Sequence, residues 1–183
     1  MSNYKTVFFI LGVLQIILGL SMIVPIMAQF YYNQVDSGFI GSGLVSIIFG
    51  VLFFLSNLDH EKKLTLPQAF LLTALSWLSI AIFGSLPFVF SDLSLSFTNA
   101  FFESMSGITT TGSTILTNLN ETPKAILLWR AMLQWLGGIG IIVMAITLMP
   151  IMNIGGMQLF VISNTHTPEK ILPKSKEISI RLI

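Results

Sequence analysis

A run of small polar residues at 107–114 lies between two apolar segments, and it is the part of the chain best suited to binding chemistry. Its centre is Thr110, Thr111, Gly112 and Ser113, which offer backbone carbonyl and hydroxyl oxygens and little bulk. Glycine at 112 is able to adopt positive φ and to aim neighbouring carbonyls at an axis. Such oxygens suit a hard monovalent cation. An ordinary polar turn is the alternative, because Thr-Thr-Gly alone is a weak signal.

The segments on either side of this run would have to position it. Residues 93–106 form a short amphipathic stretch, with Ser91 and Asp92 as expected N-caps. Residues 125–150 form a long apolar helix. The short helix either lies at a membrane surface or enters the membrane and turns back, and the polar run after it favours the second arrangement. A pore-lining re-entrant loop typically has the order helix, half-helix, polar loop and helix.

Composition places the whole chain in a membrane. Only 9% of the residues are charged, whereas soluble proteins have about 25%. Apolar runs at 7–30, 39–57, 68–90 and 125–150 are each long enough to span a bilayer. We therefore predict an all-α integral membrane fold of four transmembrane helices plus one re-entrant pore helix and filter loop. Pro25 lies near the end of the first span, where a kink or local unwinding is expected to be tolerated.

Several function classes are disfavoured by the same composition. The net charge is +1, which gives no support for nucleic-acid binding. The sequence has no cysteine, so a thiolate metal site or a cysteine nucleophile is not possible. No set of nucleophile, base and orienting group is evident, and no phosphate-binding loop. We expect that the chain is not an enzyme.

Lysine and arginine positions predict the orientation. With four spans, the N-terminus, the loop at 58–67 and the tail lie on one face, and that face carries most of the basic residues: Lys5, Lys62, Lys63, Lys170, Lys174, Lys176 and Arg181. The other face carries Lys124. The positive-inside rule therefore places both termini in the cytoplasm and the polar run toward the outside. Asp36, Asp92 and Glu121 would then add a modest acidic bias outside.

Two charged residues stand in apolar surroundings and need a partner. Glu103 lies on the short helix and Arg130 lies in the fourth span. Charges are unfavourable in lipid unless they are paired or face protein. We predict that they form a structural pair that fastens the short helix to the span behind it. The alternative is that each extends separately to the membrane interface.

The polar run also resembles a known motif. Residues 110–114, Thr-Thr-Gly-Ser-Thr, are similar to the first selectivity-filter segment of the Trk-type potassium-uptake proteins, the TrkH/KtrB superfamily, and parallel the Thr-Val-Gly-Tyr-Gly loop of potassium channels. The resemblance is closest to the TrkH branch. It extends to residues 99–104, 127–135, 137–143 and 155–159, and so covers roughly the whole chain.

The resemblance implies a fold and a site. In this family one chain carries four helix–loop–helix repeats around a pseudo-fourfold axis, preceded by two extra helices. Residues 1–67 would be the two-helix extension, 68–160 the first repeat and 161–183 a cytoplasmic basic tail. The ion would be potassium, bound by Thr110, Thr111, Gly112 and Ser113, with Thr110 and Thr111 as the metal ligands. The Thr114 hydroxyl is expected to be peripheral to the ring of carbonyls.

The implied function is potassium uptake across a bacterial inner membrane. The resemblance further implies a homodimer when the protein is complete, and a cytoplasmic nucleotide-binding regulatory subunit of the TrkA type. Because an ion filter needs a closed ring and this chain supplies one segment of four, we expect an N-terminal portion of a longer transporter. The alternatives are a potassium channel made from four copies, and a non-conducting truncated membrane fragment.

Overall fold

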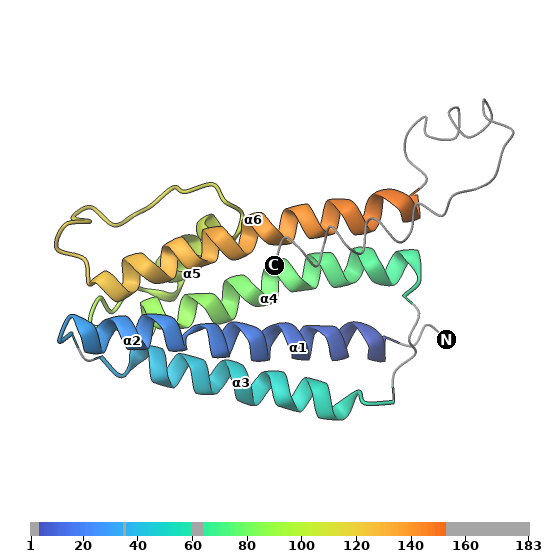
Figure 1. Ribbon diagram of the computed structural model, residues 1–183, viewed down its shortest axis with the longest axis horizontal. Coiled ribbons are helices and arrows are strands. Elements are labelled where there is room, and N and C mark those ends of the chain that lie inside the picture. The colour runs from blue at the N-terminus through green and yellow to red at the C-terminus, as the bar shows by residue number, and fades with distance from the viewer. Residues whose placement is uncertain (1–3, 35, 60–63, 153–183) are drawn as a thin grey trace, which may run out of the picture. The chain divides into compact units, whose positions relative to one another are not determined.

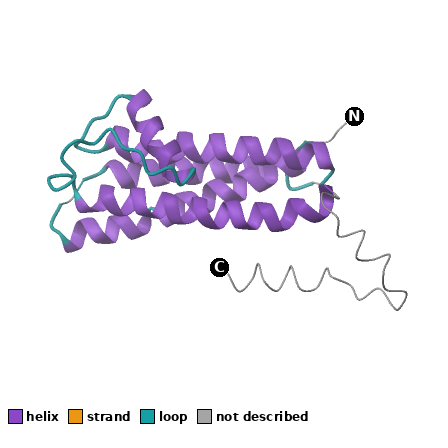
Figure 2. Ribbon diagram, turned by 90° about the horizontal axis from the view of Figure 1, so that it is seen from above, coloured by secondary structure: helices purple, strands orange, loops and turns teal. Residues whose placement is uncertain are grey.

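The computed structural model describes residues 4–34, 36–59 and 64–152, with side chains up to residue 146. This part of the chain contains helices and no strands (Figures 1 and 2). The helices are α1 (Lys5–Ser21), α2 (Ile23–Tyr31), α3 (Gly38–Ser56), α4 (Leu66–Phe90), α5 (Phe97–Ile108) and α6 (Lys124–Met152). The predicted all-α fold class is confirmed.

Among the described residues, four helical segments are long and apolar enough to cross a membrane: Lys5–Tyr31, Gly38–Ser56, Leu66–Phe90 and Lys124–Ile146. Their limits agree with the predicted spans to within a few residues. The first segment consists of α1 and α2, which are separated at Met22. Pro25 lies just inside α2, and since proline has no backbone N–H it interrupts the helical hydrogen bonds there. The expected irregularity is present, a few residues before the proline.

The chain forms two compact units, Met1–Gly138 and Ile139–Ile183. The first unit contains α1 to α5 and the first half of α6, and it holds every predicted site residue. In the second unit the structure describes the remainder of α6. The predicted tail at 161–183 lies outside the described residues. The proposed division at residue 67 into an extension and a repeat stays a prediction.

Within the first unit, α1, α3 and α4 pack side by side, and α5 packs against α4 (Figure 1). A single apolar core joins these helices to the start of α6. Its central members are large and buried: Leu18, Met22, Phe39, Phe88, Trp129 and Leu133. The indole Nε1 of Trp129 donates a hydrogen bond of 2.9 Å to the carbonyl of Gly84 on α4. Because the polar end of Trp129 is satisfied, this large ring can be fully buried.

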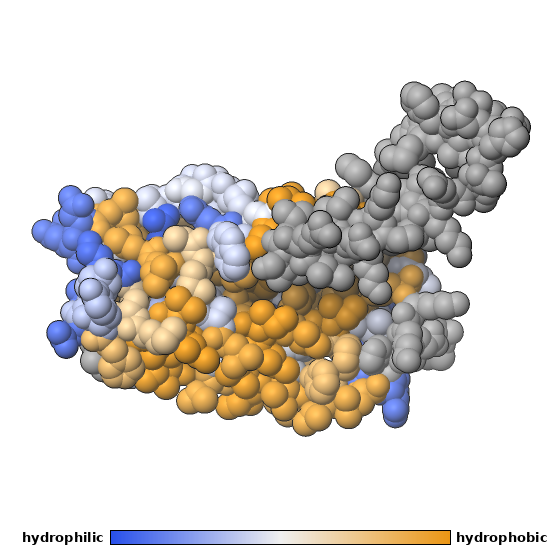
Figure 3. Space-filling model, viewed as in Figure 1, coloured by the Kyte–Doolittle hydropathy of each residue, from blue (hydrophilic) through white to orange (hydrophobic). Residues whose placement is uncertain are grey.

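The exterior of the first unit is mostly apolar along the helices. Figure 3 shows an apolar surface over the helices and polar residues gathered at the end where loops meet. On α3 the exposed apolar side chains include Ile40, Leu44, Ile48, Leu52 and Leu55. A helix that is apolar on its exposed face as well as on its buried face fits a hydrocarbon surrounding rather than water.

The short helix α5 begins later than predicted. Its N-cap is Ser96, whose Oγ accepts a hydrogen bond from the Asn99 amide at 3.4 Å. The prediction that Ser91 or Asp92 caps this helix is wrong. The preceding residues form a turn instead, in which Ser94 has φ of 43° and its amide donates to the Ser91 carbonyl. A residue in the left-handed region cannot continue a right-handed helix, so the helix starts after the turn.

Candidate functional site

The polar segment 109–116 leaves α5 in an irregular, extended form. Thr110 has φ of 59° and Gly112 has φ of 77°. Glycine accepts such a conformation without strain, as the sequence analysis expected at 112. A β-branched residue rarely does, so Thr110 is a strained position. Strain of this kind persists only where the surroundings fix the backbone, and it gathers at functional sites.

Backbone amides of this segment are turned toward α5. The amides of Thr111 and Gly112 both donate to the carbonyl of Ser106, at 3.1 and 3.3 Å, and the amide of Thr110 donates to Gly107 at 2.9 Å. No residue in the described part of the chain donates to the carbonyls of Thr110, Thr111 or Gly112. Residues 110–115 are exposed on the first unit. Three successive carbonyls are therefore free to meet a ligand at the surface of this unit.

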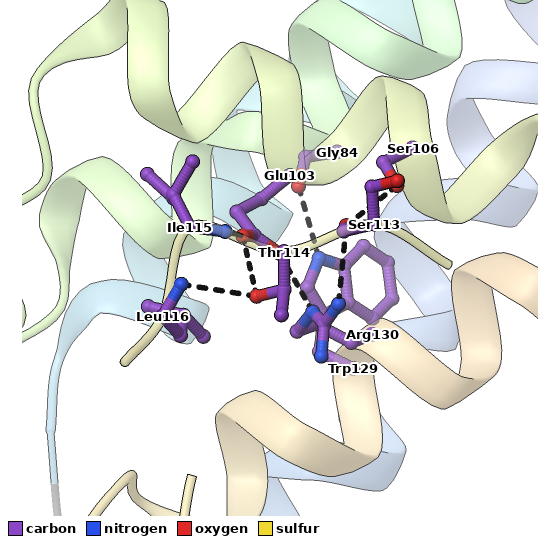
Figure 4. Close-up of polar contacts among 9 residues, drawn as sticks. All are labelled: Gly84, Glu103, Ser106, Ser113, Thr114, Ile115, Leu116, Trp129 and Arg130. Atoms are coloured by element: carbon purple, nitrogen blue, oxygen red, sulfur yellow. Dashed lines mark hydrogen bonds and ion pairs between the residues drawn. The ribbon is translucent and has the colours of Figure 1, made fainter. Parts of the chain in front are cut away.

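Glu103 on α5 accepts hydrogen bonds from the next part of the segment. Its carboxylate is fully buried on α5. The Oε1 atom accepts hydrogen bonds from Thr114 Oγ1 at 2.7 Å and from the Ile115 amide at 2.6 Å, and Oε2 accepts from Arg130 Nε at 2.7 Å (Figure 4). Buried charges need such partners, since an unpaired one is strongly unfavourable. The structure thus brings the two predicted partners, Glu103 and Arg130, into one ion pair, and that pair also contacts the polar segment.

Ser113 is anchored through its carbonyl. Ser106 Oγ donates to the Ser113 carbonyl at 2.6 Å, and Arg130 Nη2 approaches the same oxygen at 3.5 Å (Figure 4). A carbonyl oxygen has two lone pairs, and here both face donors. Ser113 was predicted as an ion ligand together with the three residues before it. Its carbonyl is occupied within this unit, whereas those of Thr110, Thr111 and Gly112 are not.

The C-terminal end of α5 rests directly on α6. A Cβ added to Gly137 would overlap the backbone carbonyl of Ile108, the last residue of α5. On the α5 side, a Cβ added to Gly107 would lie 3.0 Å from Leu133 Cβ. The two backbones therefore approach more closely than side chains would permit. This contact fixes the point from which the polar segment departs.

The sequence analysis missed three contributors to this arrangement. Ser106 supplies both a carbonyl and a hydroxyl to the segment. Thr114 was expected to be peripheral, but its hydroxyl donates to Glu103 and also accepts from the Leu116 amide at 3.0 Å. Trp129 anchors α6 one residue before Arg130. One signal was available for Ser106, because it lies three residues after Glu103 and so on the same face of α5.

Comparison with known proteins identifies the family. A model of the family TrkH, described as a cation transport protein, matches residues 5–179. The chain belongs to the TrkH family. The predicted family is thereby confirmed. Members are membrane transport proteins, which also confirms that the chain is not an enzyme.

Two curated relatives show how much of a TrkH-family protein this chain covers. The Trk system potassium uptake protein TrkI of Halomonas elongata is 38% identical over 171 residues, which are 93% of this chain and 35% of the relative. The Trk system potassium uptake protein TrkH of Escherichia coli (strain K12) is 39% identical over 160 residues, which are 86% of this chain and 33% of the relative. The chain spans about a third of the length of these relatives.

A solved structure of the TrkH family has the same fold. The crystal structure of the potassium transporter TrkH from Vibrio parahaemolyticus matches 99% of this chain and 37% of its own, with a TM-score of 0.83 and 33% sequence identity. The arrangement of four membrane-length helices and one short helix is therefore that of a TrkH protein over the same stretch.

Proposed function

We propose that this protein takes up potassium across a bacterial inner membrane, and that residues 110–113 supply one of four segments of its selectivity filter. The observation that carries the proposal is the set of free carbonyls at Thr110, Thr111 and Gly112, with their amides held against α5. A potassium ion that leaves water needs oxygen ligands in place of its hydration shell. The relatives TrkI and TrkH are potassium uptake proteins by name, which supports potassium as the ion.

The remaining assignments follow from this proposal. Residues 1–67 would be the extension and 68–160 the first repeat, with α5 as a re-entrant pore helix. Glu103 and Arg130 would be a structural pair rather than ion ligands, because the carboxylate is already bonded to three protein groups. A homodimer and a TrkA-like regulatory subunit on the cytoplasmic side complete the proposal and stay predictions.

Expression of the full-length gene product tests the proposal directly. In bacterial cells that lack other potassium systems, we expect restored growth at low potassium and uptake of potassium in preference to sodium. The measurement is the uptake of each ion, normalised to the amount of protein in the membrane. Protein present in the membrane without potassium uptake would contradict the proposal.

The mass of the isolated chain in detergent distinguishes a filter completed by a longer protein from a filter completed by four copies of this chain. A monomer of the 183-residue chain is expected if the other three segments are supplied by a longer protein. A stable tetramer would favour a channel built from four copies.

Reporter fusions test the membrane orientation. Fusions after Lys63 and after Ile183 should report cytoplasm, and a fusion after Asn120 should report the outside, because basic residues are concentrated on one predicted face. Within the first unit, the end of α2, the start of α3 and the end of α4 lie at one end, and the end of α3 and the start of α4 lie at the other (Figure 1). A fusion after Ile183 that reports the periplasm would overturn the count of four spans.

A further inference from the structure

The connection between α2 and α3 makes contacts that its place in the sequence does not predict. Asp36 Oδ2 accepts a hydrogen bond of 3.1 Å from the amide of Asp92, in the loop before α5. Gln34 Oε1 accepts one of 3.2 Å from the amide of Lys124, the first residue of α6. This connection, from the predicted extension, therefore touches the loop that leads into α5 and the first residue of α6.

Asp36 also fixes its own helix. Its other carboxylate oxygen, Oδ1, accepts a hydrogen bond of 2.8 Å from the amide of Gly38, at the start of α3. A Cβ added to Gly38 would lie 2.8 Å from the Phe90 carbonyl oxygen, at the end of α4. The start of α3 and the end of α4 are thus in close backbone contact. The carboxylate of Asp36 joins the first residue of α3 to the loop that follows α4.

A buried aromatic contact continues the connection toward the site. Phe39 follows Gly38 and is fully buried. Its ring meets Trp129 edge to face, with centroids 6.2 Å apart and an interplanar angle of 84°. Edge-to-face pairs of this kind are favourable beyond their buried area. Trp129 precedes Arg130, whose guanidinium contacts Glu103 and Ser113.

We propose that the α2–α3 connection is a positioning element for the filter segment, acting through the side-chain oxygens of Asp36 and Gln34. It holds the loop that leads into α5, which carries Glu103 and Ser106, and the beginning of α6, which carries Arg130. The extension thereby sets the geometry of carbonyls that it does not touch. This inference rests on the proposed function and assigns to the extension a part in ion discrimination.

The competing explanation for an effect of Asp36 on ion discrimination is that it acts through its negative charge alone. Asp36 and Asp92 both place a negative charge at the same end of the first unit, where cations would be concentrated. The two residues differ in their contacts, because Asp36 contributes its carboxylate and Asp92 contributes its backbone amide. Asp92→Asn keeps the donating backbone amide and both acceptor oxygens of Asp36, whereas Asp36→Asn leaves one acceptor oxygen for two amide donors, so one of the two hydrogen bonds is lost. The pair therefore provides a matched comparison.

The experiment compares Asp36→Asn with Asp92→Asn in the full-length gene product. An asparagine at 36 has one acceptor oxygen, which can serve the amide of Gly38 or that of Asp92 but not both, so the link between α3 and the loop before α5 is broken. We expect Asp36→Asn to lower the ratio of potassium to sodium uptake about threefold, a coupling of ordinary size for residues that touch neither ligand. Asp92→Asn should leave the ratio unchanged. Membrane protein amounts are measured in parallel, since a loss of folded protein alone lowers both fluxes and not their ratio.

Gly112→Ser in the same assay separates failure of this inference from failure of the proposed function. An unchanged ratio in Asp36→Asn, with a lowered ratio in Gly112→Ser, overturns the inference alone. Equal changes in Asp36→Asn and Asp92→Asn would also overturn it, in favour of electrostatics. Unchanged ratios in both Asp36→Asn and Gly112→Ser overturn the filter as well. If Asp36→Asn does not reach the membrane, Gln34→Ala replaces it, because Gln34 is exposed, and an unchanged ratio there overturns the inference.

Discussion

Replacing Arg130 with leucine is expected to destabilise the protein by about 3–5 kcal/mol, the usual effect of removing one member of a buried ion pair. Glu103 has no exposed side-chain surface, and Arg130 Nε is 2.7 Å from its carboxylate. Without the guanidinium, the carboxylate keeps two neutral donors, Thr114 and Ile115. Two neutral hydrogen bonds do not compensate a buried negative charge. The measurement is the folded yield and the melting temperature of the full-length gene product in detergent.

A double-mutant cycle tests whether this loss belongs to the pair. The variant Glu103→Leu with Arg130→Leu removes both charges and should recover part of the folded yield. Lys124→Leu is the control for loss of a cation from α6, since Lys124 is exposed and, among the described residues, its ammonium group has no ion pair or hydrogen bond. Strictly additive losses in the cycle would show that the two residues do not act as a pair.

Serine at position 112 is expected to reduce the preference for potassium over sodium by about tenfold. The reason is conformational, since a Cβ at 112 would contact only Gln134 Nε2, at an ordinary 3.5 Å. A residue other than glycine in the left-handed region is disfavoured by roughly 1–2 kcal/mol, and 1.4 kcal/mol corresponds to tenfold in an equilibrium. The backbone would relax away from φ of 77° and carry the neighbouring carbonyls with it. The measurement is uptake of each ion per amount of membrane protein.

The matched control for this substitution is Gly41→Ser on α3. A Cβ at Gly41 would meet no atom within 4 Å, and the residue is helical, so neither strain nor crowding is expected. Gly41→Ser should leave uptake and selectivity unchanged. Unchanged selectivity in Gly112→Ser would mean that the loop does not face the ion path, and the filter assignment would have to be abandoned.

The helices and the Glu103–Arg130 pair could be predicted from the sequence, because a few strict rules govern apolar runs and charges in a membrane. Long apolar runs determine spans, since every backbone group in lipid must be satisfied internally. A charge in an apolar run needs a partner, and Glu103 and Arg130 were the two such residues in this part of the chain. Their contact followed from elimination rather than from any spacing rule.

The details of the polar segment could not be predicted because tertiary contacts decide them. Threonine propensity argues against the positive φ of Thr110, which the amide hydrogen bonds to α5 nevertheless impose. The hydroxyl of Thr114 was expected to be peripheral to the ring of carbonyls, yet it donates a hydrogen bond to a buried carboxylate eleven positions earlier. The cap of α5 was misplaced because Ser91, Asp92 and Ser96 are equally good N-cap residues by type. Only the turn at Ser94 selects the last of them.

The position of Arg130 in the chain has a consequence for biogenesis. Glu103 precedes Arg130 by 27 residues in the chain, so the carboxylate of α5 is made before its counter-charge. An unpaired charge opposes insertion of a helix into the bilayer by roughly 2.5–3.5 kcal/mol. If α5 enters the membrane as the proposed pore helix, its carboxylate stays unpaired there until α6 is in place. The proposed pore helix would therefore depend on α6 for its insertion, so the ion pair bears on biogenesis as well as on the folded geometry.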